Sequence, residues 1–166
     1  AVLWVLYGYA IAFANGGTET FLGIDGWFGI DTSFLGLSAQ VADAAKPAGA
    51  FPSMAFVAFQ ATFAIITVAL ISGAIADRAK FGAWMVFAGL WATIVYFPVA
   101  NWVFNFTLED GKVVDGGWIV YGLGVIDFAG GTAVHINAGA AGLALAIVLG
   151  KRFGFSKGIT QPHNVP

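Results

Sequence analysis

The sequence contains no cysteine and few charged residues, and both shortages limit what the chain can be. Without cysteine, disulfide frameworks and cysteine-ligated metal sites are excluded. Charged residues make up 10% of the chain, whereas a soluble domain carries about 25%. Because apolar residues account for 59%, the chain has too little polar surface to remain dissolved alone. A net charge of −2 also provides no basic surface for nucleic acid, so no nucleic-acid partner is expected.

Long uncharged runs dominate what the sequence does contain. Three of them are long enough to cross a bilayer core of about 30 Å, at 54–76, 81–104 and 128–150. A shorter run at 1–14 is interpreted as a spanning helix whose start is missing, so the chain is expected to be a fragment. The sequence therefore predicts an all-α, polytopic membrane helix bundle, in which residues 1–166 form a single partial transmembrane domain with four spans.

Basic residues are distributed unevenly between the connecting segments. Because consecutive spans alternate in direction, the segment around Arg78 and the segment after residue 150 lie on one side of the membrane, and they hold five of the seven Lys and Arg residues. The outer loops 15–53 and 105–117 hold the other two, together with seven carboxylates. The positive-inside rule then places Arg78 in the cytoplasm, and the fragment starts and ends on that side.

Polar side chains within or beside the runs are the first candidates for function. His135 follows Asp127 by eight residues, about 12 Å along a continuous helix, which would place its imidazole well inside the hydrocarbon layer. An ionisable group at that depth indicates a functional site, although a neutral histidine that hydrogen-bonds between helices is the alternative. For Asp127, capping of the free backbone N–H groups at the helix start is favoured over direct cation binding.

Aromatic residues are the second group of candidates. Gln60, Phe63 and Thr67 have the spacing of one helix face, and Phe63 would there form either a pore constriction or simple packing. Phe104 ends its run at the outer surface, where aromatic residues usually form an interfacial belt, but ring faces also attract cations. No nucleotide-binding loop, zinc pair or nucleophile elbow is found, so neither a cofactor, a metal site nor enzymatic activity is predicted.

One continuous motif connects these candidates to a known family. The segment 127–137, Asp-Phe-Ala-Gly-Gly-Thr-Ala-Val-His-Ile-Asn, resembles the signature of the ammonium transporter family, which includes Amt, methylammonium permease and Rhesus proteins. The resemblance extends over nearly the whole chain, with further matching segments at 3–9, 58–67, 76–78, 96–98, 150–152 and 162–164. It is closest to bacterial Amt-like members and identifies the four spans with helices two to five of that family.

The resemblance implies a fold and a function. Family members are eleven-helix bundles that form homotrimers in the cell membrane, with one narrow apolar pore through each subunit. The chain is thus expected to contribute to ammonium or ammonia transport, with the lipid bilayer, the other trimer subunits and a cytoplasmic regulatory protein as partners. Alternatives on the same scaffold are a related gas or methylamine channel and an ammonium sensor, and a further one is a membrane scaffold that transports nothing.

Individual roles follow from the same resemblance. His135 corresponds to the first of two pore histidines, and Phe63 corresponds to one of two gate rings. The substrate vestibule would include Gln60, Phe59 and Phe104, the last at a position where the family often has tryptophan. The structural carboxylate that organises this vestibule would be Asp127.

Overall fold

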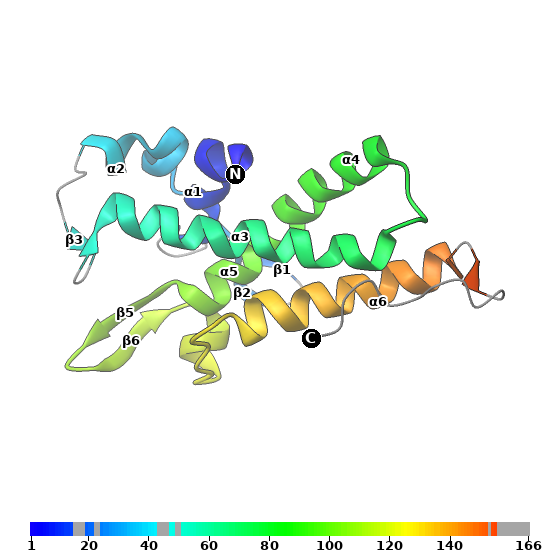
Figure 1. Cartoon of the computed structure of the whole chain (residues 1–166). Helices are drawn as coiled ribbons and strands as arrows, with labels where there is room; N and C mark the ends of the chain where they lie inside the picture. The colour runs from blue at the N-terminus through cyan, green and yellow to red at the C-terminus, as the bar shows by residue number, and fades with distance from the viewer. Residues whose placement is uncertain (15–18, 22–23, 43–46, 49–50, 153, 156–166) are drawn as a thin grey trace.

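Long helices make up most of the structure, a computed structural model that describes residues 1–14, 19–21, 24–42, 47–48, 51–152 and 154–155 (Figure 1). Within these ranges, three helices are long and apolar enough to cross a membrane: Ser53–Ile75, Phe81–Phe104 and Gly131–Leu149. The predicted helical membrane fold is therefore confirmed. The helix near the N-terminus is shorter than a membrane span, and Lys157 and His163 lie outside the described residues.

Several of the long helices contain a π-helical segment. The first helix consists of η1 (Trp4–Gly8) and α1 (Tyr9–Ala12), whereas α3 (Ser53–Ile75) is α-helical throughout. The next span combines α4 (Phe81–Trp91), η3 (Ala92–Tyr96) and α5 (Phe97–Phe104). The last span combines η5 (Gly131–Ile136) and α6 (Asn137–Leu149). Shorter helical segments in the connections are η2 (Thr32–Leu37), α2 (Ser38–Ala42) and η4 (Trp118–Gly122).

The outer connections contain small antiparallel hairpins, which the sequence analysis did not predict. They pair β1 (Glu19–Phe21) with β2 (Ile24–Phe28), β3 (Pro47–Ala48) with β4 (Phe51–Pro52), and β5 (Phe106–Glu109) with β6 (Lys112–Gly116). The β5–β6 turn is formed by Asp110 and Gly111, whose φ angles are +50° and +75°. An Asp-Gly pair with two positive φ angles is typical of a tight hairpin turn, so local chemistry explains this element.

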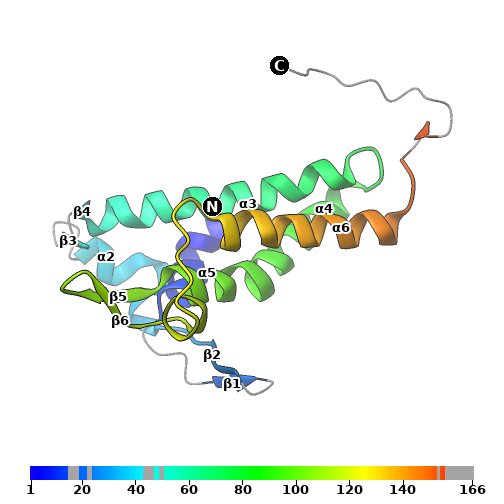
Figure 2. The same cartoon turned by 90° about the horizontal axis from the view of Figure 1, so that it is seen from below.

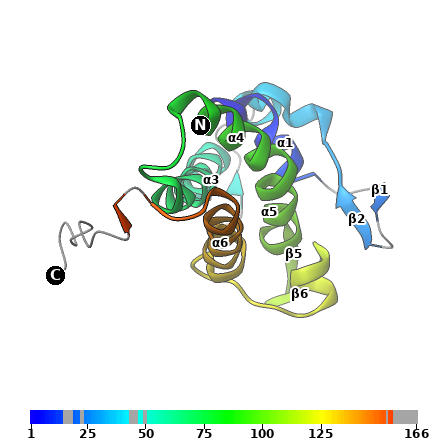
Figure 3. The same ribbon diagram turned by 90° about the vertical axis from the view of Figure 1, so that its right-hand side faces the viewer.

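The helices pack around a common centre. α3 runs beside α6, and α5 contacts both α1 and the start of the last span (Figures 2 and 3). Gly142 permits the close approach of α6 to α3, because a Cβ at this position would lie 3.4 Å from the Cβ of Ala74. At Gly8 a Cβ would lie 2.5 Å from the Phe97 ring, so the first helix can approach α5 only because this residue is glycine.

Asn101 closes the end of the first helix. Its Nδ2 donates to the carbonyl oxygens of Ile11, Ala12 and Ala14 at 3.3, 3.1 and 3.2 Å. These carbonyls lie in the last turn, where the regular helical bonds end, and Ile11 accepts a long backbone bond, from the Ala14 N–H at 3.5 Å. The Asn101 side chain is 8% exposed, so its amide replaces hydrogen bonds that water would otherwise provide. Asn105 adds a bond from its Nδ2 to Ala14 at 2.8 Å.

Arginine side chains close the opposite end of the bundle. Arg78, which follows α3, donates to the carbonyl oxygens of Ala146 and Gly150 at the end of α6, and to Ala74 of its own helix. Arg152, which follows α6, donates in turn to Gly73 of α3. This reciprocal pair, called the arginine clamp below, brings the segments around residues 78 and 150 to the same end of the bundle, as the alternation of spans predicted.

We predict that Asn101→Asp destabilises the full-length protein by about 1–3 kcal/mol, the usual cost of leaving buried polar groups without partners. The substitution keeps the shape of the side chain but directs an anionic acceptor at the three carbonyl oxygens. The apparent melting temperature of the purified protein in detergent measures the effect. Asn105→Asp is the matched control, since it removes a single side-chain hydrogen bond, to the Ala14 carbonyl, at a half-buried site and should cost less. Equal melting temperatures for both variants and the parent would contradict this role.

Candidate functional site

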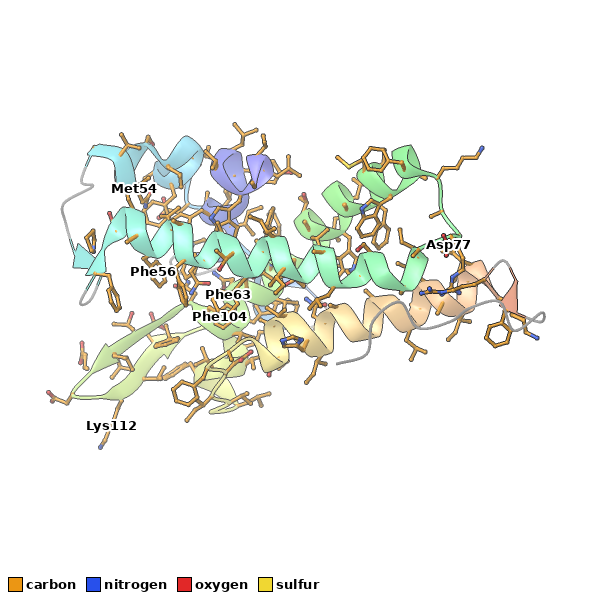
Figure 4. The ribbon with its side chains drawn as sticks, viewed as in Figure 1. Met54, Phe56, Phe63, Asp77, Phe104 and Lys112 are labelled. Atoms are coloured by element: carbon orange, nitrogen blue, oxygen red, sulfur yellow. The ribbon has the colours of Figure 1, made fainter. Side chains whose placement is uncertain are left out.

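Phenylalanine side chains from α3 and α5 meet near the middle of the bundle. The ring centroids of Phe63 and Phe104 are 5.5 Å apart, and those of Phe59 and Phe63 are 5.0 Å apart with the planes at 85° (Figure 4). Phe63 and Phe104 are half-buried, while Phe59 is 57% exposed. The structure thus brings together three residues that sequence analysis assigned separately to a gate and a vestibule, and we call them the aromatic cluster.

Gly130 lies against this cluster at the start of the last span. Its φ is +81°, a left-handed conformation that residues with a Cβ rarely adopt. A Cβ here would also lie 2.7 Å from Cγ2 of Val134 and 3.4 Å from Cδ1 of Phe63. Glycine is therefore required for the turn into η5 and for its packing on Val134, while the Phe63 ring lies at contact distance from this turn.

Asp127 caps the first turn of η5. Its Oδ1 accepts from the N–H of Gly131 at 2.8 Å, and its Oδ2 accepts from the N–H groups of Thr132 and Ala133 at 2.8 and 3.0 Å. These are N–H groups for which a helix start has no internal partner, and a negative charge is favoured there by the helix dipole. The negative charge of the carboxylate is therefore stabilised by three backbone N–H groups of η5.

The position of this cap corrects the span predicted at 128–150. Residues 128–130 form a bend, and the helix begins at Gly131 and ends at Leu149. The bend is needed because a carboxylate can reach N–H groups four to six residues ahead only if the chain turns back over it. His135 is consequently four residues into the helix, about 6 Å along its axis, so the depth of about 12 Å that a continuous helix implied was too large.

His135 lies on the exposed side of η5. Its backbone N–H donates to the Gly130 carbonyl oxygen at 2.9 Å, and its side chain is exposed in this chain. Gly139, one turn later, has open space around it, whereas Gly142 contacts α3. The last span thus packs against α3 at Gly142 and leaves open space at Gly139.

The buried side of the site is lined by polar groups from α3 and η3. Gln60 is 6% exposed and Thr67 is fully buried, so the face shared by these residues points into the bundle. The Tyr96 hydroxyl is also buried, close to Thr67 and Asp127, but without a partner in hydrogen-bonding geometry. Sequence analysis did not select Tyr96, although a tyrosine in the middle of an uncharged run was a visible signal.

The chemistry available at this site is that of aromatic rings. Ring faces attract cations, and the partly exposed Phe59 and half-buried Phe104 present theirs around Phe63. The described residues contain no group of three or more His, Asp and Glu side chains that would hold a metal ion. The site therefore combines aromatic rings, a capped helix start and a nearby imidazole.

Comparisons of the sequence with a family model and with known proteins all identify the same family. Residues 1–166 match the model of the Ammonium Transporter Family. The chain is 57% identical to proteins called ammonium transporter in Mycobacterium bovis and Mycobacterium tuberculosis, over 99% of the chain and 36% of each relative. It is 44% identical to the ammonium transporter of Bacillus subtilis, over 99% of the chain and 35% of that protein. The chain thus spans about a third of the length of these relatives.

Solved structures agree with the sequence matches. The crystal structure of the G343C mutant of Candida albicans Mep2 superposes with a TM-score of 0.70 at 34% identity. The alignment covers 91% of this chain and 29% of Mep2. The crystal structure of Candida albicans Mep2 without that substitution gives a TM-score of 0.65 at 35% identity.

We predict that Gly130→Ala destabilises the full-length protein more than Gly124→Ala. Both glycines have left-handed φ angles, +81° and +66°, so both substitutions carry a backbone cost of about 1–2 kcal/mol. Only at Gly130 would the new methyl group also meet Val134 and Phe63, because Gly124 has nothing within 4 Å. The difference between the two melting temperatures isolates the steric contact, and no difference would mean that the cluster tolerates a methyl group here.

Proposed function

The chain belongs to the ammonium transporter family, and from that membership we propose that the full-length protein moves ammonium across the membrane as ammonia. Ammonium is captured at the aromatic cluster and gives its proton to water at the pore entrance, and the neutral ammonia then passes Phe63 toward His135. The observation that carries this proposal is the contact of Phe63 with both Phe104 and the Gly130 turn, next to the helix that bears His135.

Capture at the cluster follows from the chemistry of a small cation. Ammonium is strongly hydrated, and its charged form is costly to bring into an apolar pore. Aromatic faces replace part of the lost hydration at the pore entrance. Phe104 and Phe59 supply such faces on either side of Phe63, so we assign them to the vestibule together with Gln60, and Phe63 to the gate.

Asp127 acts on the cation indirectly in this proposal. Its two oxygens accept from the N–H groups of Gly131, Thr132 and Ala133, and the carboxylate holds the start of η5 against the cluster. Its role is therefore to position the vestibule, rather than to bind the ion.

His135 is assigned to the pore itself. Its side of η5 is left uncovered by the chain, and Gly139 leaves space beside it, so the remaining helices of the full-length protein would complete the lumen there. An imidazole at this position can accept a hydrogen bond from ammonia or relay a proton.

The family resemblance and the distribution of basic residues together suggest how the protein is oriented and assembled in the membrane. We place the arginine clamp on the cytoplasmic side, where the positive-inside rule expects Arg78, Lys151 and Arg152. The outer hairpins then face the opposite compartment. A homotrimer and a cytoplasmic regulatory protein, which the family resemblance implies, complete the proposed assembly.

We predict that Phe104→Ala raises the half-saturating ammonium concentration about two- to fivefold, the factor that corresponds to a cation–ring attraction of about 0.5–1 kcal/mol. Phe104→Trp should lower it, because tryptophan presents the better ring face. Methylammonium uptake by cells that carry the full-length protein measures both. Phe106→Ala is the matched control, since Phe106 is a nearby exposed ring in β5. Unchanged uptake at low concentration in both Phe104 variants would reduce this residue to interfacial packing.

The second prediction of this proposal concerns His135. His135→Ala in the full-length protein should remove normal ammonium flux, either entirely or in exchange for a less selective cation current, while leaving assembly intact. Uptake and electrical current are measured together on size-checked protein in liposomes. Ile136→Ala, at the adjacent and also exposed apolar residue, is the control and should keep both. If His135→Ala left flux, current and selectivity against potassium unchanged, the proposed pore role would be refuted.

A further inference from the structure

A tyrosine and a threonine connect the first helix to the neighbouring span. The hydroxyl oxygen of Tyr7 lies 2.8 Å from Oγ1 of Thr93, and Thr93 donates in turn to the carbonyl oxygen of Gly89, four residues earlier in its own span, also at 2.8 Å. Because the single hydroxyl hydrogen of Thr93 is used at Gly89, Tyr7 is the donor of the pair. Two hydrogen bonds in series thus run from a tyrosine on one helix to the backbone of the next.

A second tyrosine and threonine repeat this arrangement between η3 and α3, with one bond not formed. Oγ1 of Thr67 donates to the carbonyl oxygen of Phe63, four residues earlier in α3, at 2.6 Å. The hydroxyl of Tyr96 lies next to Thr67 but outside hydrogen-bonding geometry. Since the hydroxyl hydrogen of Thr67 is already used, its oxygen is left as an acceptor. One further bond, from Tyr96 to Thr67, would complete a second series of the same kind, and it would end at Phe63.

The burial of the Tyr96 hydroxyl favours this bond. Tyr96 and Thr67 are both completely buried, and a hydroxyl in an apolar interior is costly without a partner. The described residues already cover the Tyr96 oxygen, so a helix from the rest of the full-length protein could reach it only by displacing them. Asp127, the other acceptor nearby, already receives three backbone N–H groups, whereas the Thr67 oxygen receives no hydrogen bond among the described residues. Thr67 is therefore the acceptor that fits.

The position of this pair relates it to the aromatic cluster. Tyr96 precedes Phe104 by eight residues in the same span, and the Phe104 ring contacts the Phe63 ring of α3 (Figure 4). A bond from Tyr96 to Thr67 would therefore connect the same two spans a second time, at the backbone carbonyl of Phe63 itself. Hydrogen bonds in series polarise one another, so the bond to Phe63 would also become stronger.

We propose that Tyr96 is a positioning residue of the gate, whose hydroxyl donates to Thr67 and thereby holds the Phe63 turn of α3 where the Phe63 and Phe104 rings touch. The inference rests on the proposed role of Phe63 as a gate. Tyr96 does not contact the transported species and acts only through the backbone of α3. When the gate opens, α3 moves at this turn and the bond to Thr67 breaks, so the bond favours the closed arrangement.

Single and double variants of the purified full-length protein test the hydrogen bond by itself. Tyr96→Phe removes only the hydroxyl, and it should lower the apparent melting temperature in detergent by about 2 °C, the shift for one hydrogen bond in a large protein. In a Thr67→Val background the same substitution should lower it no further, because the acceptor is absent. Tyr7→Phe, with and without Thr93→Val, is the matched control, since that pair forms the same bond at 2.8 Å.

Methylammonium uptake by cells that carry the full-length protein tests the effect on the gate. Loss of one hydrogen bond from the closed arrangement should increase the open fraction, and with it the maximal rate in Tyr96→Phe, about two- to fivefold. The half-saturating concentration should stay unchanged, because the rings of Phe104 and Phe59 remain. Tyr7→Phe should change neither quantity, since its series of bonds ends at Gly89, away from the gate.

Three results would overturn the proposal. If Tyr96→Phe had the same effect on the melting temperature in the parent and in Thr67→Val, Tyr96 would not donate to Thr67. An unchanged or lower maximal rate in Tyr96→Phe would mean that the bond does not hold the gate closed. Equal increases in Tyr96→Phe and Tyr7→Phe would show a general loosening of the bundle. A parent without any uptake would instead refute the proposed function, and the melting temperatures would still decide whether the bond forms.

Discussion

Helix ends are where a membrane protein must satisfy backbone polar groups with little help from water, and in this chain side chains perform that task at each end of the bundle. Asn101 closes the end of the first helix, Asp127 closes the start of the last span, and Arg78 with Arg152 closes the ends of α3 and α6. Each of these side chains binds backbone atoms of a neighbouring segment or turns the chain back on itself. The same bonds therefore stabilise the helices and fix how the spans are placed.

The candidate site depends on two of these closures. Asp127 holds the turn that contains Gly130, and Gly130 lies against Phe63. Asn101 lies on α5, one turn before Phe104, and ties that helix to the end of the first one. The two closures therefore place the Gly130 turn against Phe63 and hold the helix that carries Phe104.

The π-helical segments affect which side chains reach the interior. A π-helical turn adds a residue to the helix and shifts the face that the following side chains present. Tyr96 ends one such segment, η3, and is completely buried, whereas His135 lies in another, η5, and is exposed. Uniform helical spacing does not describe either position, and no sequence pattern predicted these π-helical segments.

The sequence by itself determined the membrane class, the three long spans, the family and the candidate side chains apart from Tyr96, because uncharged runs and a specific motif are local properties of a chain. It also predicted that the segments around Arg78 and residue 150 share one side, since spans must alternate. Only the tertiary structure decided that Phe59, Phe63 and Phe104 touch, that the last helix begins at Gly131, and that two arginines close each other's helices. Those features depend on the distance between helices that are far apart in the chain, and no periodicity within a single segment contains that distance.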